Sequence, residues 1–417
     1  MELALNHNRP TIMHIDLNSC FATIEQQANP LLRGKPIAVA AYTTPNGCIV
    51  SPSMEAKTYG IKTGMTVREA RCLYPDLIVR VPDPPKYRFV HQQFSKIFRD
   101  FSPDVVPKSI DEAVIDFTST TSMYKQDLTD IAKQIKRRMR QDIGEWISCS
   151  IGIATNRFLA KTGAGLIKPD GLEVIDHTRI PIVYASLSLI DLCGINTRFQ
   201  ARLNACGIFT PIDFLNASIE KLQKQVFQSI AGYYWYVRLR GWEIDAVDFA
   251  RKSYGQSYAL QKHTADSKEL APLLMKLTEK MGRRLRRAGL AARGIHVSCV
   301  YRDWTHWHTG RTFDIELYTT QELYRKVFLV FNRQPEKKVI AKLAVSCFDL
   351  ISSTRMQEDL FDTEREKKRR VSDALDKIND RYGEYVITPA LMLGLNEQII
   401  DRIAFGGVKE LDEIYAG

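Results

Sequence analysis

Residues 108–117 read KSIDEAVIDF, a stretch in which apolar residues recur as they do along a half-buried β-strand. Two adjacent acids, Asp111 and Glu112, interrupt the apolar pattern. Neighbouring side chains of a regular strand point to opposite faces of the sheet, so these carboxylates would diverge unless the backbone bends. Pro107 and Ser109 are compatible with a hairpin corner, which would let both acids converge.

A third acid, Asp16, comes near the end of an earlier apolar stretch that reads TIMHIDL over residues 11–17. Two carboxylates roughly 4 Å apart repel by about 4 kcal/mol at an effective dielectric constant near 20. Half-buried carboxylates tolerate this only when cations offset it, and oxygen ligands favour Mg²⁺ or Mn²⁺ over zinc. The pattern indicates a metal site for phosphoryl transfer. By themselves, Asp111 and Glu112 would be interpreted as exposed turn acids, and it is Asp16 at the end of a similar strand that favours the metal site.

The part of the chain before residue 176 predicts an α+β domain. Strands are expected at 11–17, in VVPKSIDEAVIDF and in WISCSIGIAT, with shorter ones in KPIAVAA and GCIVSPS. Helices are expected in NSCFATIEQQ, with Asn18 or Ser19 as N-cap, and over 87–101 and 126–142. This order of elements predicts a core sheet with helices on one face.

Short helices are expected from residue 176 onward. The stretch GINTRFQARLNACGI, residues 194–208, is similar to a helix-hairpin-helix, with glycine turns at Gly194 and Gly207. Such turns present backbone N–H groups to a phosphate without reading base sequence. The usual Gly-x-Gly has become Gly-Ile-Asn here, and an ordinary helical hairpin is the alternative.

Positive charge is concentrated in one block of the chain. The whole chain has a net charge of +10, and residues 251–350 alone carry 19 Lys+Arg and 9 Asp+Glu. That concentration favours a polyanion partner, most simply nucleic acid, over a surface that serves solubility. A predicted helix over 269–290 ends in more cations than helix capping needs. These are Arg283, Arg284, Arg286 and Arg287.

The segments after this helix, GIHVSCVY, HTGRTFDIEL and KVIAKLAVSCFDL, predict strands. We therefore expect a second, small α+β domain with a basic face.

The composition, 45% hydrophobic and 25% charged over 417 residues, is that of a globular protein. No stretch approaches the roughly 20 apolar residues of a membrane helix, and the first residues lack a secretory layout. We expect a cytoplasmic protein. Because the eight cysteines form no Cys-x-x-Cys pair and no zinc spacing, we expect reduced thiols and no structural zinc.

Taken together, these stretches resemble the Y-family translesion DNA polymerases, in the bacterial DNA polymerase IV and polymerase V catalytic-subunit group. The motifs occur in order over roughly the first 350 residues. They are HIDLNSCFATIE (14–25), GCIVSPSMEAKTYGIKTGM (47–65), SIDEA (109–113), IGIATNRFLAKTGAGLIKPDGLEVI (151–175) and the hairpin at 194–208. The combination of SIDEA with an upstream strand aspartate and a Lys-Pro-x-Gly motif is specific.

The resemblance implies a multidomain α+β protein with right-hand polymerase architecture. In chain order the expected parts are a palm at 10–27 and 87–175, fingers at 28–86, a helical thumb with the helix-hairpin-helix at 176–241, a linker at 242–256, a little finger at 257–350 and a C-terminal tail at 351–417. Short fingers imply an open, permissive site.

The resemblance also implies roles for single residues. Asp16, Asp111 and Glu112, with the main-chain carbonyl of Leu17, would hold two Mg²⁺ ions, or Mn²⁺. Phe21 lies where the family keeps an aromatic steric gate against ribonucleotides, although without the family it reads as a core aromatic.

Ser51, Lys57 and Lys168 lie where the family binds the triphosphate of the incoming nucleotide, and Lys161 is a fainter candidate. Many relatives have tyrosine and arginine at the positions of Met54 and Lys57. Methionine cannot hydrogen-bond a phosphate and lysine lacks the bidentate fork, so a weaker grip on nucleotide is expected.

Other departures from the family pattern lie next to the first acid. Asn18 replaces a second aspartate that many relatives have, at a position that is not an obligatory ligand. Ser19 and Cys20 replace aromatics and, with Met54, favour the polymerase V-like branch.

The peptide QEDLF, residues 357–361, resembles the clamp-binding peptide of bacterial polymerases. Leu360 and Phe361 would be apolar anchors and Gln357 a polar contact. The expected partners are therefore primer-template DNA, dNTP, a bacterial sliding clamp and accessory mutasome proteins. The following stretch, TEREKKRRVSDALDKINDRYG, predicts a solvated amphipathic helix.

We expect a template-directed, low-fidelity translesion DNA polymerase without a proofreading exonuclease, working in the cytoplasm at the nucleoid. Two alternatives stay open: a non-catalytic DNA-binding or scaffold paralogue, and a two-metal nuclease. The presence of all three acids weighs against the first, and the steric-gate and triphosphate positions weigh against the second.

Overall fold

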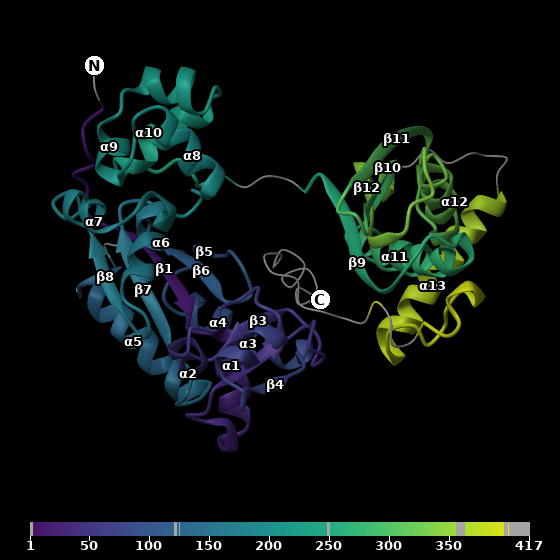
Figure 1. Ribbon diagram of the computed structural model, residues 1–417, viewed down its shortest axis with the longest axis horizontal. Helices are drawn as coiled ribbons and strands as arrows, with labels where there is room; N and C mark the ends of the chain where they lie inside the picture. The colour runs from purple at the N-terminus through teal and green to yellow at the C-terminus, as the bar shows by residue number, and fades with distance from the viewer. Residues whose placement is uncertain are drawn as a thin grey trace. The chain divides into compact units, whose positions relative to one another are not determined.

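The structure, a computed structural model, describes residues 3–120, 123–124, 126–247, 251–355, 363–395 and 399 (Figure 1). The chain folds into two compact units, and the boundary between them lies between residues 247 and 248. The boundary falls inside the range 242–256 that the sequence predicts as a linker. None of the helices within these described ranges combines the length and the apolar character needed to span a bilayer.

The first unit is built on a five-stranded sheet with the order β5-β6-β1-β7-β8. Its strands are β1 (Ile12–Leu17), β5 (Val105–Pro107), β6 (Glu112–Asp116), β7 (Cys149–Ala154) and β8 (Leu172–Ile175). The central strand β1 is antiparallel to both neighbours, and β7 is parallel to β8. Strands β1, β5, β6 and β7 lie in segments predicted as strands, whereas β8 was not predicted. The pairing places the acid-bearing ends of β1 and β6 side by side.

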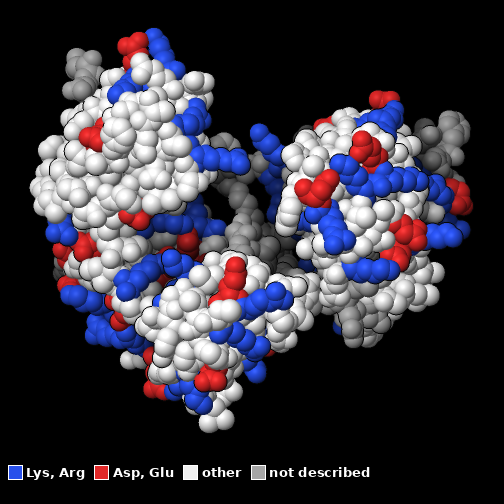
Figure 2. Space-filling model, viewed as in Figure 1, with Lys and Arg blue, Asp and Glu red and all other residues white. Residues whose placement is uncertain are grey.

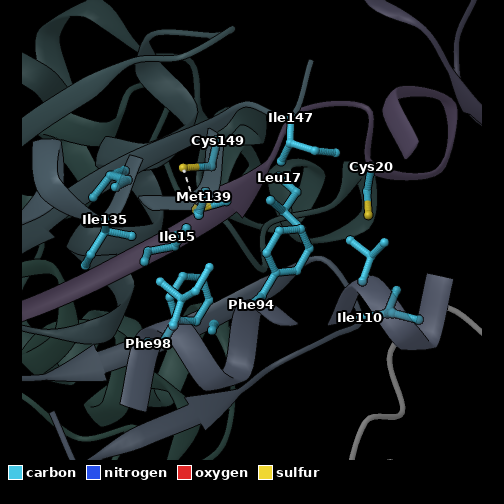
Figure 3. Close-up of a cluster of buried hydrophobic side chains, with 14 of the residues drawn as sticks. Ile15, Leu17, Cys20, Phe94, Phe98, Ile110, Ile135, Met139, Ile147 and Cys149 are labelled. Atoms are coloured by element: carbon cyan, nitrogen blue, oxygen red, sulfur yellow. Dashed lines mark hydrogen bonds between the residues drawn. The ribbon is translucent and has the colours of Figure 1, made fainter. Parts of the chain in front are cut away.

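One face of this sheet is packed by α4 (Pro84–Arg99) and α5 (Leu128–Asp142). Ile15 and Leu17 of β1 point toward Phe94 and Phe98 of α4 (Figure 3). Both phenylalanines are buried, and each such ring contributes about 1.5–3 kcal/mol through the apolar area it removes from water. The strand end that carries Asp16 is therefore fixed from below by a dense apolar core.

The opposite face of the sheet is covered by α6 (Arg157–Leu166), so the prediction of helices on one face only is wrong. Contact is close because Gly152 of β7 has no side chain: a Cβ there would lie 2.0 Å from the carbonyl oxygen of Ala160. Phe158 of α6 then joins a second core with Trp235, their rings 5.5 Å apart and edge to face. The sequence order alone did not show that α6 crosses to this face.

The remaining elements of the first unit lie in the palm, fingers and thumb ranges. Helix α1 (Cys20–Ala28) follows β1 within the range predicted as palm. The range predicted as fingers contains η1 (Pro30–Leu32), β2 (Ile37–Ala40), β3 (Ile49–Pro52), α2 (Met54–Thr58), α3 (Val67–Leu73) and β4 (Ile78–Arg80), with a three-stranded sheet in the order β3-β2-β4. In the thumb lie α7 (Ile180–Ser186), η3 (Leu189–Asp191), α8 (Thr197–Ala205), α9 (Pro211–Asn216), η4 (Lys221–Val226) and α10 (Ala231–Leu239).

The glycine turns predicted in the thumb are present on both sides of α8. Gly194 has φ +99° and Gly207 has φ +71°, a backbone region that favours glycine. Asn196 caps α8, its side chain accepting a hydrogen bond of 2.9 Å from the backbone N–H of Phe199. The local fold at 194–208 is therefore a helix between two tight glycine turns.

The second unit has a four-stranded antiparallel sheet with the order β11-β10-β12-β9. Its strands are β9 (Ser253–Thr264), β10 (Leu290–Tyr301), β11 (His306–Leu317) and β12 (Ile340–Ser352), and its first two helices are α11 (Ser267–Arg287) and α12 (Thr320–Phe331). The predicted α+β character and the last three strands are confirmed. The first residues of β9 lie inside the range expected to be linker.

The C-terminal part that the structure describes belongs to this second unit and is not a separate tail. It contains η5 (Ser353–Arg355), α13 (Thr363–Tyr382) and η6 (Ala390–Met392). Met392 is buried, and the Lys276 ammonium of α11 donates a 2.6 Å hydrogen bond to the carbonyl of Leu395. The predicted clamp peptide, including Gln357, Leu360 and Phe361, lies outside the described residues.

Candidate active site

The pairing of β1 with β6 brings the three acids together. Asp16 lies directly opposite Glu112 in the register, and the backbone N–H of Leu17 donates to the carbonyl of Asp111 at 3.0 Å. Strand β6 begins only at Glu112, and the N–H groups of Lys108 and Ser109 both donate to the Glu112 carbonyl. The chain therefore turns a corner just before Glu112, as the sequence predicts.

Each carboxylate has a polar partner. The Lys168 ammonium lies 2.6 Å from Asp16 Oδ2, and the Lys161 ammonium lies 2.6 Å from Glu112 Oε2. The Ser109 hydroxyl donates to Asp111 Oδ1. Two of the three acids are thus held by lysine in this arrangement and the third by a hydroxyl group.

A buried histidine also contacts the site. His14 is 1% exposed, and its Nε2 lies 3.5 Å from Glu112 Oε2. Sequence reasoning missed this residue, although the signal was available. Because side chains two apart on a strand share a face, His14 had to lie on the same side of β1 as Asp16.

The two adjacent acids have opposite electrostatic environments. Burial raises the pKa of Asp111, the negative charges of Glu112 and Asp16 raise it further, and the Ser109 hydrogen bond opposes them. Burial would also raise the pKa of Glu112, but the hydrogen bonds and charges of His14 and Lys161 outweigh it and lower this pKa to about 2. Positive charge is therefore in greatest demand at Asp111.

Among the residues that the structure describes, no three His, Cys, Asp or Glu side chains are grouped closely enough to hold a metal ion as they stand. The donors nevertheless suit a divalent cation. All are oxygens at one end of the sheet, and two lysine ammonium groups already supply the positive charge beside Asp16 and Glu112. Carboxylate oxygens are the ligands that Mg²⁺ and Mn²⁺ prefer.

Two predicted phosphate ligands, Lys57 and Lys168, lie near Asp16. Partial burial lowers the pKa of Lys57, the positive charge of Lys168 lowers it further, and Asp16 opposes this. Lys168 is positioned by its loop, in which the Ser150 hydroxyl donates to the Ile167 carbonyl at 3.0 Å. Both lysines therefore direct positive charge to the carboxylate end of β1.

The same loop is fixed to α5 and to β7. The Lys136 ammonium donates to the carbonyls of Asp170 and Gly171 at 2.6 and 2.8 Å. The Ser150 hydroxyl oxygen also accepts from the Gly171 N–H at 3.2 Å and lies 3.2 Å from Asn18 Oδ1, an alternative acceptor for its one proton. Sequence reasoning missed Ser150. This residue links the loop of Lys168 to Asn18, which lies two residues after Asp16.

Phe21 and Ser51 lie inside the protein. Phe21 is 3% exposed and stacks on Tyr87 with ring centroids 4.5 Å apart. Ser51 is buried, and its hydroxyl accepts a hydrogen bond from the backbone N–H of Ala22 at 3.4 Å. Phe21 is therefore a core aromatic, and Ser51 connects β3 to α1 by a hydrogen bond. Both residues have a structural role, and a role in nucleotide binding would be additional to it.

Three of the five departures from the family pattern, Ser19, Met54 and Lys57, contact one another. The Ser19 hydroxyl donates to Met54 Sδ at 3.3 Å, and the Lys57 ammonium lies 4.0 Å from the same sulfur. Ser19 occupies the N-cap position of α1 with φ +49°, but its side chain does not cap the helix. The three substituted positions therefore form one local cluster beside the acids.

The four predicted DNA-binding arginines lie in the second unit. Arg283 and Arg286 are buried under α13, and Arg287 pairs with Asp380 of that helix. Arg284 donates to the Gly255 carbonyl at 2.8 Å. On the face in view in Figure 2, Lys and Arg side chains lie among acidic ones.

A palm-like sheet with three acids at one end, small fingers, a helical thumb and a separate four-stranded domain define a DNA polymerase of the right-hand type. The fold is similar to that of the Y-family DNA polymerase chimera Dbh-Dpo4(243-245)-Dbh, with a TM-score of 0.72 and 24% identity over 82% of this chain and 99% of that one. For the insertion ternary complex of Dbh DNA polymerase, the TM-score is 0.58 and the sequence identity is 23%, with the same coverage of both chains.

Sequence comparison identifies the family. Residues 15–164 match the impB/mucB/samB family and residues 251–360 match its C-terminal domain. DNA polymerase IV of Moorella thermoacetica is 34% identical over 92% of this chain and 96% of its own length, and that of Pelotomaculum thermopropionicum is 33% identical with the same coverage. The chain therefore belongs to the impB/mucB/samB family of Y-family DNA polymerases. DNA polymerase IV 1 of Bacillus subtilis is 30% identical over 93% of this chain and 94% of its own length.

These relatives carry the polymerase IV name, whereas Ser19, Cys20 and Met54 favoured the polymerase V-like branch. As a class, Y-family DNA polymerases work with divalent metal ions.

Proposed function

We propose that this chain extends a primer by template-directed DNA synthesis and inserts nucleotides opposite damaged template bases, without proofreading. The observation that carries the proposal is the convergence of Asp16, Asp111 and Glu112 at one end of the central sheet, with Lys57 and Lys168 beside them. Acids for metal binding and cations for phosphate are what phosphoryl transfer requires in one place.

Asp16, Asp111, Glu112 and the main-chain carbonyl of Leu17 would hold two Mg²⁺ ions, with Mn²⁺ as a substitute. When bound, the ions supply the positive charge that activates the primer hydroxyl and offsets charge on the leaving pyrophosphate. Lys161 and His14 keep Glu112 ionised, with a pKa of about 2, at any pH near neutrality. If Asp16 held a metal ion, it would give up its contact with Lys168, and that ammonium would then be available to the nucleotide.

Lys168 and Lys57 then bind the triphosphate of the incoming dNTP, with Ser51 contributing from β3. Lysine acts on phosphate as a point charge and does not require the geometry of a bidentate contact. Phe21 closes the sugar side of the site, where its ring leaves no room for a 2′-hydroxyl. The Tyr87 ring stacks on the Phe21 ring and fixes its position.

The thumb would hold the duplex through backbone N–H groups at the Gly194 and Gly207 turns. The second unit would add phosphate contacts from its cations, including Arg283, Arg284, Arg286 and Arg287. A sliding clamp would bind at 357–361, and mutasome proteins are candidate partners at the nucleoid. The solved insertion ternary complex of Dbh supports primer-template DNA and dNTP as the substrates.

Primer extension with the full-length chain, dNTPs and MgCl₂ tests the proposal on undamaged and abasic templates. We expect extension by the wild type, and a loss of at least about a thousandfold for Asp111→Asn, as for removal of a metal ligand or charge at a polymerase centre. DNA binding should be retained. Asp116→Asn is the matched control, because this acid of the same strand pairs with Arg157 away from the site. Extension by Asp111→Asn at the wild-type rate would refute the site.

A second candidate is a non-catalytic DNA-binding paralogue that serves as a scaffold. The observation in its favour is that Asp16 and Glu112 are already neutralised by lysine and no three-ligand group is preformed among the described residues. The same assay separates the two, since the scaffold binds primer-template but extends nothing with either Mg²⁺ or Mn²⁺.

A further inference from the structure

The last turns of α11 and the helix α13 meet through charged side chains. The Arg286 guanidinium binds Asp376 with two hydrogen bonds, 2.6 Å from Nε and 3.0 Å from Nη2. Arg283 and Arg287 both donate to Asp380 Oδ1, at 2.8 and 2.6 Å. Three of the four arginines expected on a DNA-binding face are thus bound by two aspartates of the same chain.

The charges on the two helices are arranged as matching stripes. Arg283 and Arg287 are four residues apart, as are Asp376 and Asp380, so each pair lies on one helix face. Asp373 extends the acidic stripe by accepting a 2.6 Å hydrogen bond from the Tyr318 hydroxyl. α13 therefore presents to α11 a row of carboxylates at helical spacing, which resembles in charge a short stretch of nucleic-acid backbone.

The seam between the helices is hollow. Its charged side chains line a cavity of about 250 Å³, namely those of Arg283, Arg286, Arg287, Asp373, Asp376, Lys377 and Asp380. At about 30 Å³ each, roughly eight water molecules would fill it. Among the apolar residues of α13, Val371 is 52% exposed, whereas Leu375 and Ile378 are half-buried. The helix is therefore held over the arginines by ion pairs together with partial apolar packing.

The chain beyond α13 is attached to α11 independently of these ion pairs. Met392 is 3% exposed, and the Leu395 carbonyl accepts the hydrogen bond from Lys276, which lies near the middle of α11. Leu395 and Ile399 also pack against the apolar core of the second unit. Because of this attachment, α13 would remain tethered to the domain after leaving the arginines.

We propose that Arg283, Arg286 and Arg287 form a binding site for the phosphodiester backbone of DNA, and that α13 occupies it as an intramolecular competitor. Carboxylate and phosphate are the two anions that fit the guanidinium fork. The Arg286 side chain is only 3% exposed. Its Nη1 donates to the Tyr318 carbonyl and the Thr320 hydroxyl, whereas its Nε and Nη2 are bound by Asp376, so DNA would reach these two nitrogens by displacing α13. Each ion pair lost to α13 is replaced by one to phosphate, so the exchange leaves no buried arginine without an anion.

This inference rests on the proposed function only in taking DNA as the polyanion. The test compares full-length Asp376→Asn/Asp380→Asn with the charge-matched Glu364→Gln/Glu366→Gln, whose residues lie exposed in the first turn of α13. The measurement is fluorescence anisotropy of a labelled primer-template duplex without dNTP, from about 0.05 to 0.3 M salt. Catalysis plays no part in this measurement, and primer extension is assayed separately.

The first variant should bind DNA about tenfold or more tightly at about 0.1 M salt than the control. Its plot of log K against log salt concentration should be steeper by about 2, since each added phosphate contact contributes roughly 0.9. Adding Arg283→Ala and Arg287→Ala should remove the gain. Equal affinity and slope in the first variant and its control would show that α13 is a permanent part of the domain, and the proposal would be wrong.

Circular dichroism establishes that each variant is folded. If the double variant unfolds, Asp380→Asn alone decides, because this carboxylate is 44% exposed and still contacts both Arg283 and Arg287. It is compared with Glu366→Gln, and its slope should be steeper by about 1 to 2. No steepening relative to that control contradicts the proposal.

Discussion

Replacement of Gly152 by alanine should be one of the most damaging single changes in the first unit. The new Cβ would lie 2.0 Å from the carbonyl oxygen of Ala160 and 2.4 Å from the backbone nitrogen of Ala164. Both are main-chain atoms of α6, so no side-chain rotation relieves the clash and the helix must move from the sheet. Overpacking of this kind costs about 1–3 kcal/mol and sometimes more.

Gly165, in the same helix, is the matched control. A Cβ there would meet nothing within 4 Å, so Gly165→Ala removes only the entropic cost of glycine in a helix and should stabilise by about 0.5–1 kcal/mol. The two Gly→Ala variants should therefore change stability in opposite directions.

Thermal unfolding followed by circular dichroism and calorimetry measures the difference in the transition of the first unit. In a unit of this size each kcal/mol shifts Tm by about 2–4 °C, so Gly152→Ala should lower Tm by about 2–12 °C and Gly165→Ala should raise it slightly. A displaced α6 also carries Lys161 away from Glu112, so primer extension should fall with the first variant only. If Gly152→Ala melts at or above Gly165→Ala, the close packing of α6 on β7 is refuted.

The salt bridge between Glu112 and Lys161 predicts that stability depends on pH. The pKa of Glu112 is about 2, below the usual 4.5, so the stabilising contribution of the ionised carboxylate is present above pH 4.5 and is lost as pH falls toward 2. The difference in unfolding free energy between wild type and Glu112→Gln, measured in urea, should shrink over that interval, and a constant difference would contradict the assignment. Phe21→Ala should cost about 3–5 kcal/mol through the cavity beside Tyr87 and should also increase ribonucleotide incorporation; unchanged sugar selection would remove the gate. Ser150→Ala should loosen the loop of Lys168 and raise KM for dNTP several-fold while Kd for DNA stays constant, and an unchanged KM would count against the positioning role.

The strands that carry the acids could be predicted because both signals, the apolar pattern of the strands and the turn residues before Glu112, are local in the sequence. β1 and β6 are apolar enough to mark buried strands, and Pro107 and Ser109 marked the corner before Glu112. Convergence of Asp16 with Glu112 followed from strand pairing, which the resemblance supplied. The identity of the partners could not be predicted in the same way, because Lys161 and Lys168 reach the acids from a helix and a loop whose positions depend on tertiary packing.

The second unit shows where sequence patterns were insufficient. The first residues of β9 include Ser253, Gly255 and Gln256, whose polar or small side chains are typical of a linker, although Tyr254 between them is buried in the core of the second unit. The arginines at the end of α11 suggested a basic face because, in the sequence, Arg283, Arg284, Arg286 and Arg287 far outnumber the single nearby acid, Glu279. Their partners, Asp376 and Asp380, come about ninety residues later, and no periodicity connects two stripes so far apart in the chain.

The small core of the fingers has a consequence for how the nucleotide pocket responds to its substrate. Its fully enclosed side chains are Ala38, Ala40, Ile49, Ala56, Ile61, Val67, Ala70 and Leu77, half of them alanine and none aromatic. Alanine removes little apolar area from water, so this lobe opens at a lower free-energy cost than the phenylalanine-rich palm. Amide protons of β2 and β3 should therefore exchange with deuterium sooner than those of β1. A fingers region with such local opening motions can accommodate a bulky or distorted base pair that a rigid one would exclude.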